Sequence, residues 1–327
     1  MTSINVSNIP IRQLYMVLSL RSISYAQFAL ESLLRNCSEA VGLNLITDSI
    51  ADKDTLAEAL IELQPDPRHR WSVTAEDELM DQEATIFASH ANLRAFRHGH
   101  PCWRKITDPL LLGAPGDELV LLDPDLYFPN VFNFERTPET GLLLMWQKPN
   151  CLLPEEVVAR AMSNGIPLAH HVDIGVAHWR AGQDLDWIDW LIGKLSGGSP
   201  LPRVMHVEAI VWAAIAMRQG GGHLDSKYWV CWHRSQLKRV KRRLGTSGIR
   251  ILSSERWITL KCFHAGGEAK WWLPEAQKTG MLQRGKDQLG PGKIIPYIEL
   301  TPETYAREQR AKRMLRNLGY YQLFGSS

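Results

Sequence analysis

The chain has 327 residues, of which 45% are hydrophobic and 22% are charged, and its formal net charge is +2. This apolar fraction supports a large core and excludes disorder over most of the chain. The near balance of charges excludes a nucleic-acid binder that works mainly by electrostatic attraction. No apolar run approaches the roughly 18 residues of a membrane span. The five cysteines never occur in CxxC spacing, so we expect reduced thiols in a cytoplasmic protein.

The N-terminal third alternates between apolar runs typical of buried strands and segments with helical spacing. Such a succession predicts a largely parallel sheet with right-handed crossovers. Ligands of these sheets bind beyond the carboxyl ends of the strands, which here means after Leu20, Ile46 and Leu122. The predicted strands are 14–20, 41–46, 71–74 and 118–122, and the predicted helices are 25–33, 56–63 and most of 76–112.

The second half is less regular, and its patterns predict further strands and helices. The strands are 142–146, 172–179, 249–252 and 257–263, and the helices are 184–195, 203–217, 227–244 and 302–318. We therefore expect an α/β protein with one large domain, residues 1–280, in which helices flank a mixed, mainly parallel sheet. Residues 281–327 are expected to form a C-terminal extension with a basic helix.

Two carboxylates, Asp123 and Asp125, directly follow the predicted strand 118–122. Residues at i and i+2 of a strand face the same way, and Pro124 ends the strand because it cannot donate to the sheet. Two carboxylates at the rim of a sheet can share one divalent cation with a bound diphosphate. The alternative is that the pair only caps a turn, which is the expected role of the chain's other two Asp-x-Asp pairs.

A second segment, residues 264–272, follows the apolar run that ends at Phe263. Its histidine can complete a carboxylate metal site. Gly266 and Gly267 allow a ligand to approach the backbone closely, and Lys270 could neutralise a phosphate oxygen. The alternative is an ordinary glycine turn with an exposed histidine and a solvated lysine.

Together the two segments resemble the family of glycogenin and the bacterial lipopolysaccharide galactosyltransferases, glycosyltransferase family eight. In that family a strand-end Asp-x-Asp pair is followed, after a substrate-binding half, by the pattern His-x-x-Gly-x-x-Lys-x-Trp. Here this pattern is met by His264, Gly267, Lys270 and Trp272. The resemblance implies a GT-A fold and a metal-dependent transfer of a sugar from a nucleotide sugar, with a UDP-sugar as the expected donor and with retention of configuration.

The resemblance also implies a role for each matching residue. Mn²⁺ or Mg²⁺ would be held by Asp123, Asp125 and His264. The donor would be bound by Ser19, Tyr25, Asp48, Lys105, Gly267 and Lys270, with Arg104 as the alternative to Lys105. The catalytic groups on the sugar and acceptor side would be Asp173 and Glu208.

Several of these residues also have a purely structural interpretation. Tyr25 would pack in the core at a helix start, and Asp48 would cap the following helix. Asp173 would be a hydrogen-bonded carboxylate within a strand. Glu208 would be a carboxylate on a helix face.

The chain departs from the family at two positions, with Trp271 in place of a proline and Asp173 in place of an asparagine. These changes leave open a second function, a catalytically silent GT-A domain that binds a glycan or a nucleotide sugar. A nucleotidyltransferase is disfavoured, because no Gly-rich phosphate loop with a lysine follows the first strand.

The expected partners are the nucleotide-sugar donor and a glycan, lipid or small-molecule acceptor, without nucleic acid. Two basic runs could bring the protein to a membrane surface through anionic headgroups, or could bind an acidic acceptor. The alternative is that both runs are solvated helix faces. The runs are Lys238, Arg239, Lys241, Arg242 and Arg243, and Arg307, Arg310, Lys312, Arg313 and Arg316.

Overall fold

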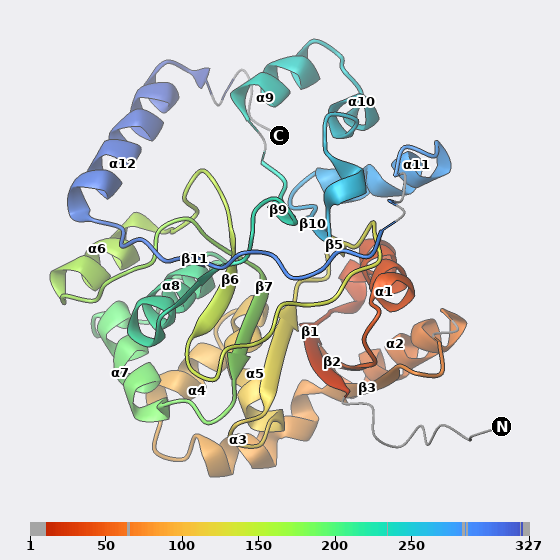
Figure 1. Cartoon of the computed structure of the whole chain (residues 1–327). Helices are drawn as coiled ribbons and strands as arrows, with labels where there is room; N and C mark the ends of the chain where they lie inside the picture. Colours follow the sequence, from red (N-terminus) through yellow and green to blue (C-terminus); the bar gives the residue numbers. More distant parts are fainter. Residues whose placement is uncertain are drawn as a thin grey trace.

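The computed structural model describes residues 11–63, 66–233, 235–282, 285, 287–320 and 322. Residues 1–10 and 323–327, the outer ends of the two predicted regions, lie outside this part. Within it the main sheet has eight strands, β1 (Arg12–Val17), β2 (Val41–Thr47), β3 (Arg70–Ala75), β4 (Glu118–Leu122), β6 (Leu142–Trp146), β7 (Val172–Arg180), β8 (Gly221–His223) and β11 (Ile295–Pro296). Their order across the sheet is β11-β8-β6-β7-β4-β1-β2-β3 (Figure 1). The expected α/β class is confirmed.

The main sheet is mixed, with both parallel and antiparallel pairs of strands. The pairs β1–β2, β2–β3, β1–β4 and β6–β8 are parallel, whereas β7 runs antiparallel to both β4 and β6. Parallel strands need a crossover, which α1 (Ile23–Asn36) and α2 (Ile50–Glu62) supply between the first three strands. The carboxyl ends of β1, β2 and β4 therefore lie at one edge of the sheet.

Helices cover both faces of the main sheet. One core holds residues of α4 (Ala91–Arg97), α5 (Arg104–Leu112), α6 (Glu155–Ser163), α7 (Leu185–Ser196) and α8 (Val207–Gln219), and the other holds residues of α1 and α2. Side chains alternate between these cores along β4: Leu119 and Leu121 belong to the first, Val120 and Leu122 to the second. Each fully buried aliphatic side chain contributes about 1.5–3 kcal/mol.

A smaller sheet of order β5-β10-β9 stands beside the carboxyl edge of the main one (Figure 1). It consists of β5 (Leu126–Tyr127), β9 (Trp229–Cys231) and β10 (Cys262–His264). β5 begins directly after Asp125, at Leu126, and runs antiparallel to β10, so that His264 pairs with Leu126. The N–H of Ala265 also donates to the carbonyl of Asp125 at 2.9 Å. This pairing brings the two motifs together across the chain.

Most predicted elements of the N-terminal half are confirmed, with shifted boundaries. The first strand ends at Val17, and Leu20–Ser22 form a 3₁₀ turn. The helical region 76–112 contains the 3₁₀ turn Glu76–Leu79, α3 (Met80–Ile86), α4, the 3₁₀ turn Pro101–Trp103 and α5. It breaks near Gly99 and Pro101 as expected, and also at residues 87–90, which the pattern did not predict.

Three predictions for the second half are wrong. Residues 227–244 form β9 and then α9 (Gln236–Arg243) rather than one helix. Residues 249–252 belong to α10 (Gly248–Leu252), whose start is capped by Ser247 Oγ accepting from the N–H of Arg250 at 3.3 Å. Of residues 257–263, the first three form a 3₁₀ turn and only the end enters β10. A short apolar run has the same composition in a buried strand and in a short helix, so the pattern alone does not distinguish the two structures.

The C-terminal segment crosses the molecule after α11 (Leu273–Lys278) and leads to α12 (Pro302–Asn317) (Figure 1). On the way β11 pairs antiparallel with β8, and the N–H of His170 donates to the carbonyl of Ile298 at 2.7 Å. The boundary at residue 280 stays a prediction. Among the described residues no helix is both long and apolar enough to cross a membrane.

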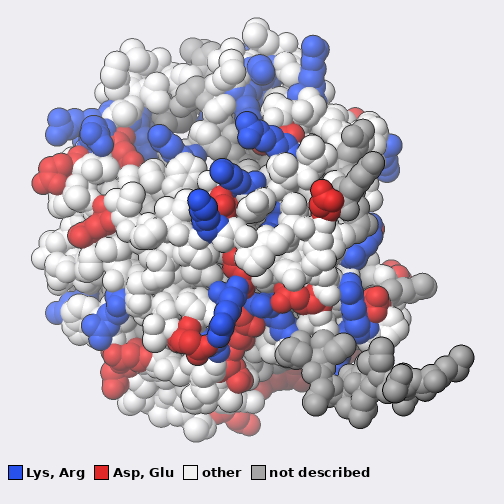
Figure 2. Space-filling view, in the orientation of Figure 1, with Lys and Arg blue, Asp and Glu red and all other residues white. Residues whose placement is uncertain are grey.

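Lys and Arg side chains lie over the region of α9 and α12, interspersed with acidic ones (Figure 2). In α9, Lys238 forms an ion pair with Glu255 at 2.7 Å, and Arg242 pairs with Glu268 at 3.5 Å. The exposed basic residues of the two helices are Lys241, Arg243, Arg307, Arg310, Arg313 and Arg316. Their contact with a membrane surface or an acidic acceptor stays a prediction.

Candidate active site

A cavity of about 480 Å³ opens at the carboxyl edge of the main sheet. All eleven residues predicted for the site line it, namely Ser19, Tyr25, Asp48, Lys105, Asp123, Asp125, Asp173, Glu208, His264, Gly267 and Lys270. They come from the chain just after β1, β2 and β4, from the helices α1, α5 and α8, from strand β7, and from the end of β10 and the turn that follows it. The volume lies within the range of small-molecule sites.

The two carboxylates stand where strand β4 ends. The N–H of Asp123 still donates to the carbonyl of Gly175 on β7, at 2.8 Å, and Pro124 then terminates the ladder. One oxygen of each carboxylate is taken by a lysine: Asp123 Oδ1 lies 2.7 Å from Lys105 Nζ, and Asp125 Oδ2 lies 3.2 Å from Lys270 Nζ. The lysines thereby orient both carboxylates.

The other oxygen of each carboxylate faces His264. Nε2 of His264 is 3.2 Å from Asp125 Oδ1 and 3.7 Å from Asp123 Oδ2. One ligand atom from each of the three side chains lies within 4.8 Å of the others. The arrangement brings two carboxylate oxygens and one imidazole nitrogen together, a donor set that suits Mn²⁺ or Mg²⁺.

The opposite ring nitrogen of His264 is held by Asp173 on β7. Nδ1 lies 2.9 Å from Oδ1 and 3.0 Å from Oδ2 of this carboxylate, which also accepts from the N–H of Gly175 at 3.0 Å. A Cβ at Gly175 would lie 2.6 Å from Nδ1, so only glycine fits here. Asp173 is thus the hydrogen-bonded strand carboxylate of the structural interpretation, and it also lines the cavity.

Burial and charge shift the pKa values of this group in opposite directions. For His264, burial lowers the pKa, but Asp173 and Asp125 outweigh it and raise the pKa well above its usual value. For Asp125, burial raises the pKa, but His264 and Lys270 outweigh it and lower the pKa below its usual range. Burial raises the pKa of Asp123 despite Lys105. The carboxylates around His264 therefore favour a positive charge on its ring.

Glu208, in the first turn of α8, is fully buried and points from that helix into the cavity that it lines. Its Oε1 lies 3.0 Å from Lys105 Nζ and accepts from Trp212 Nε1 at 3.1 Å. Its Oε2 has no hydrogen-bond partner in the described part of the protein. Burial raises the pKa of Glu208 to about 8, although Lys105 opposes the shift. For Lys105, burial lowers the pKa, but Asp123 and Glu208 together raise it.

The turn after β10 forms another wall of the cavity. Gly267 has a φ of 63°, and a Cβ added at Gly266 or Gly267 would meet no atom within 4 Å. The backbone is therefore open to a ligand on this side. Lys270 Nζ lies 4.2 Å from the centre of the Tyr25 ring, whose edge also meets the exposed Trp271. Tyr25 lines the cavity and, partly buried at the start of α1, also packs against the core.

Asp48, just after β2, pairs with Arg104 at the start of α5. The helix cap predicted as its alternative role belongs to Ser49, whose Oγ accepts from the N–H of Asp52 at 3.2 Å. Asp48 therefore remains available to the cavity that it lines. Ser19 caps a 3₁₀ turn without a side-chain hydrogen bond and lines the same cavity.

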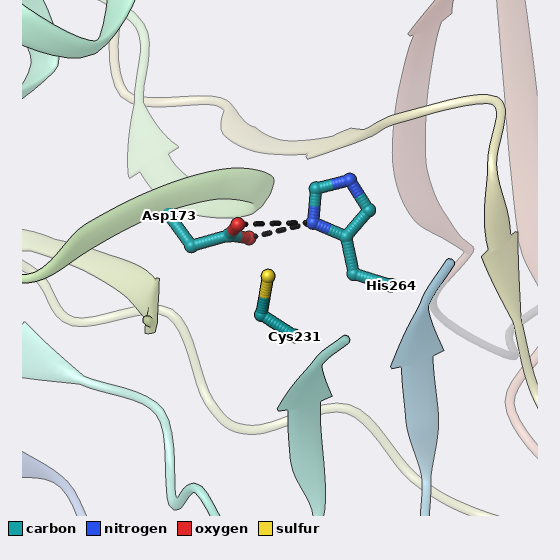
Figure 3. A group of neighbouring side chains, drawn as sticks. All are labelled: Asp173, Cys231 and His264. Carbon is teal, nitrogen blue, oxygen red and sulfur yellow. Dashed lines mark hydrogen bonds and ion pairs between the residues drawn. The ribbon is translucent and has the colours of Figure 1, made fainter. Parts of the chain in front are cut away.

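The sequence analysis missed Gln147 and Cys231, which lie beside Asp173 and His264. Asp173, Cys231 and His264 point toward one another from three strands (Figure 3), with their ligand atoms within 4.8 Å. Sγ of Cys231 also lies 3.5 Å from Oε1 of Gln147. A single cysteine without a motif carries no local signal, so only the order of the strands could reveal this group.

No protein-family model matches the chain, and no curated protein matches it. Among solved structures it is similar to mouse xyloside xylosyltransferase 1, at 14% identity with a TM-score of 0.49, over 80% of this chain and 99% of that one. It is also similar to the glycosyltransferase GlyE of Streptococcus pneumoniae, at 13% identity with a TM-score of 0.46, over 85% and 66% of the two chains.

A third similar structure is the galactosyltransferase LgtC in complex with donor and acceptor sugar analogues, at 10% identity with a TM-score of 0.44, over 82% and 92% of the chains. These structures are glycosyltransferases, in agreement with the resemblance drawn from the motifs. With such identities and TM-scores below 0.5 they carry no argument about chemistry, which rests on the residues of the cavity.

Proposed function

We propose that the protein is a metal-dependent glycosyltransferase that moves a sugar from a UDP-sugar to an acceptor. The observation that carries the proposal is the convergence of Asp123, Asp125 and His264 on one wall of the cavity, next to the open glycine turn and Lys270. Retention of configuration is part of the proposal because the motif resemblance implies it.

The residues present fit Mn²⁺ or Mg²⁺. Each carboxylate keeps one oxygen free of lysine, and Asp173 fixes the ring of His264 so that Nε2 faces these oxygens. A carboxylate behind a ligating histidine is a common support of metal sites. When bound, the ion acts as a Lewis acid that stabilises the negative charge of the departing nucleoside diphosphate.

Other residues of the chain bind and orient the donor. The backbone of Gly266 and Gly267 lets a diphosphate approach closely, and Lys270 supplies a positive charge for its oxygens. The ring of Tyr25 offers a flat face beside the nucleotide base. Asp48 is held by Arg104 in a position to accept from the base or the ribose.

Two buried carboxylates serve the sugar and acceptor side. Oε2 of Glu208 is left without a partner among the described residues, and a hydroxyl of the sugar or acceptor would satisfy it. Lys105 holds Glu208 and Asp123 at once and so couples this side of the cavity to the cation side. Asp173 acts mainly through His264 and is a positioning residue in this proposal.

The test is an assay of UDP release from a panel of UDP-sugars, with and without Mn²⁺. We expect release that depends on the ion and rises with a suitable acceptor. Binding of UDP without release from any sugar of the panel would overturn the enzyme in favour of the silent binding module.

A further inference from the structure

His264 stands between two groups of ligating side chains, one at each ring nitrogen. Nε2 faces Asp123 and Asp125, whereas Nδ1 faces Asp173 and Cys231 (Figure 3). We propose that Asp173, Cys231 and Nδ1 of His264 form a second cation site, specific for a thiophilic ion such as Zn²⁺, and that its occupancy prevents a hard cation from binding at the Asp pair. The site stands by itself, and the inhibitory consequence rests on the function proposed above.

The three side chains lie close enough together to share one ion. A tetrahedral ion with bonds of about 2.0 Å to nitrogen and oxygen separates these two ligands by roughly 3.3 Å. The observed distance from His264 Nδ1 to Asp173 Oδ1 is 2.9 Å, and all three ligand atoms lie within 4.8 Å of one another. The Nδ1–Oδ1 pair has to separate by roughly 0.4 Å to admit the ion.

Gln147 is placed to complete the coordination. Its Nε2 donates to the carbonyl of Val172 at 3.0 Å, which turns Oε1 toward Cys231. The distance from Cys231 Sγ to this oxygen is 3.5 Å, and a tetrahedral ion with a sulfur bond of about 2.3 Å and an oxygen bond of about 2.0 Å separates the two ligands by roughly 3.5 Å. Gln147, just after β6, thus offers a fourth oxygen beside the three side chains from β7, β9 and β10.

An ion can reach this point from solvent. Asp173 and His264 line the main cavity, and Cys231 lines a neighbouring cavity of about 510 Å³. Gln147 lines both cavities, so the four ligands form part of the wall between them. An entry path is one of the requirements of a working metal site.

The thiol makes the two sites prefer different metal ions. Thiolate and imidazole ligands suit Zn²⁺, whereas the carboxylates of Asp123 and Asp125 suit hard ions such as Mg²⁺ and Mn²⁺. Zn²⁺ at the inner site displaces the proton of the thiol and any proton held on Nδ1 of His264.

The shared histidine makes the two sites exclusive. A neutral imidazole offers a lone pair on only one nitrogen and carries a proton on the other. When Nδ1 binds Zn²⁺, Nε2 keeps its proton and donates to Asp125 Oδ1, 3.2 Å away, instead of binding a second ion. A thiophilic cation bound at Nδ1 therefore inhibits the enzyme, because it prevents Nε2 of His264 from binding the catalytic metal ion.

The direct test uses Co²⁺, the spectroscopic substitute for Zn²⁺, with the full chain. We expect one equivalent of Co²⁺ to produce a thiolate-to-cobalt charge-transfer band, which Zn²⁺ then removes. Cys231→Ser should abolish the band and weaken Zn²⁺ binding by about 10-fold or more, whereas Cys102→Ser, which changes another thiol of the main cavity, should leave the band unchanged. No band in the wild type, or a band retained in Cys231→Ser, would overturn the site.

Alkylation of the wild type provides a measurement that does not depend on the folding of a variant. Zn²⁺ should slow the modification of Cys231 by iodoacetamide about 10-fold or more, while the rate at Cys102 stays the same, as read by peptide mass spectrometry. Equal rates at Cys231 with and without Zn²⁺ would contradict the proposal.

Competition tests the exclusion separately. One equivalent of Zn²⁺ should remove the electron paramagnetic resonance signal of protein-bound Mn²⁺ from the wild type, and should do so about 10-fold less effectively with Cys231→Ser. Simultaneous binding of both ions would refute the exclusion. Because the cobalt, alkylation and resonance measurements need no nucleotide sugar, they decide the second site even if UDP-sugar turnover fails.

Discussion

Nδ1 of His264 lies 2.9 Å from Oδ1 of Asp173, and this contact turns the other ring nitrogen toward the Asp123–Asp125 pair. The first prediction follows from it. Asp173→Ala removes the acceptor, so Mn²⁺ affinity should fall about 10- to 100-fold, whereas Asp173→Asn retains an oxygen for Nδ1–H and should lose less. Titration calorimetry with Mn²⁺ measures both, and equal affinity of the wild type and the alanine variant would contradict the positioning role.

The proposed metal ligands predict a loss of linked stabilisation. Mn²⁺ and UDP together should raise the melting temperature of the wild type, because ligands that bind only the folded state stabilise it. Asp125→Ala and His264→Ala should remove the part that depends on Mn²⁺. Asp186→Ala is the matched control, since this aspartate belongs to another Asp-x-Asp pair and its side chain is 94% exposed. Full Mn²⁺-dependent stabilisation in both site variants would refute the assignment.

Lys105 Nζ touches both Asp123 and Glu208, with distances of 2.7 and 3.0 Å. Lys105→Ala should lower the free energy of unfolding by about 3–5 kcal/mol, because it leaves two buried carboxylates without their partner. Adding Glu208→Gln should recover part of this loss. Urea denaturation of the wild type, the two single variants and the double variant gives the unfolding free energies for a double-mutant cycle. Additive effects would show that Lys105 and Glu208 do not interact.

Gly175 predicts a steric effect on the site. In Gly175→Ala the new Cβ would lie 2.6 Å from His264 Nδ1, so the ring must move. We expect a loss of about 1–3 kcal/mol in stability together with weaker Mn²⁺ binding. Gly290→Ala is the control, because its Cβ meets no atom within 4 Å, and it should change stability by less than about 0.5 kcal/mol. Wild-type Mn²⁺ affinity in Gly175→Ala would contradict the packing argument.

His178 on β7 predicts a dependence of stability on pH. Burial, with smaller effects of Arg12 and Lys261, lowers its pKa to about 3, against about 6.5 in the unfolded chain. Between these values the unfolded state binds the extra proton, so stability falls as the pH is lowered from about 6.5 toward 3. One such proton contributes a slope of up to about 1.4 kcal/mol per pH unit.

His178→Phe tests this dependence, because it removes the titrating group and keeps a ring beside Phe134 and Trp229. Unfolding free energies of the variant should decline less steeply between pH 6.5 and 4 (urea denaturation at each pH). A slope equal to that of the wild type would show that other groups cause the acid sensitivity.

The sequence predicted residues that the structure brings together in one cavity, but it predicted the elements around them less well. Local signals marked the end of β4, the glycine turn after β10 and the helix starts, because Pro, Gly and capping residues restrict the backbone directly. The short apolar runs at 249–252 and 257–263 were misread, since a buried strand and a short buried helix have the same composition. Around them, packing in a third small core decides the conformation.

By itself, the sequence determined the alternation of strands and helices and placed the two carboxylates at a strand end, because these properties depend on neighbours in the chain. The tertiary structure alone decided that Asp173 and His264, 91 residues apart, share a proton, that Lys105 joins Asp123 to Glu208, and that Cys231 lies behind the histidine. Such contacts depend on the order of strands across two sheets, and no local pattern of residues encodes that order.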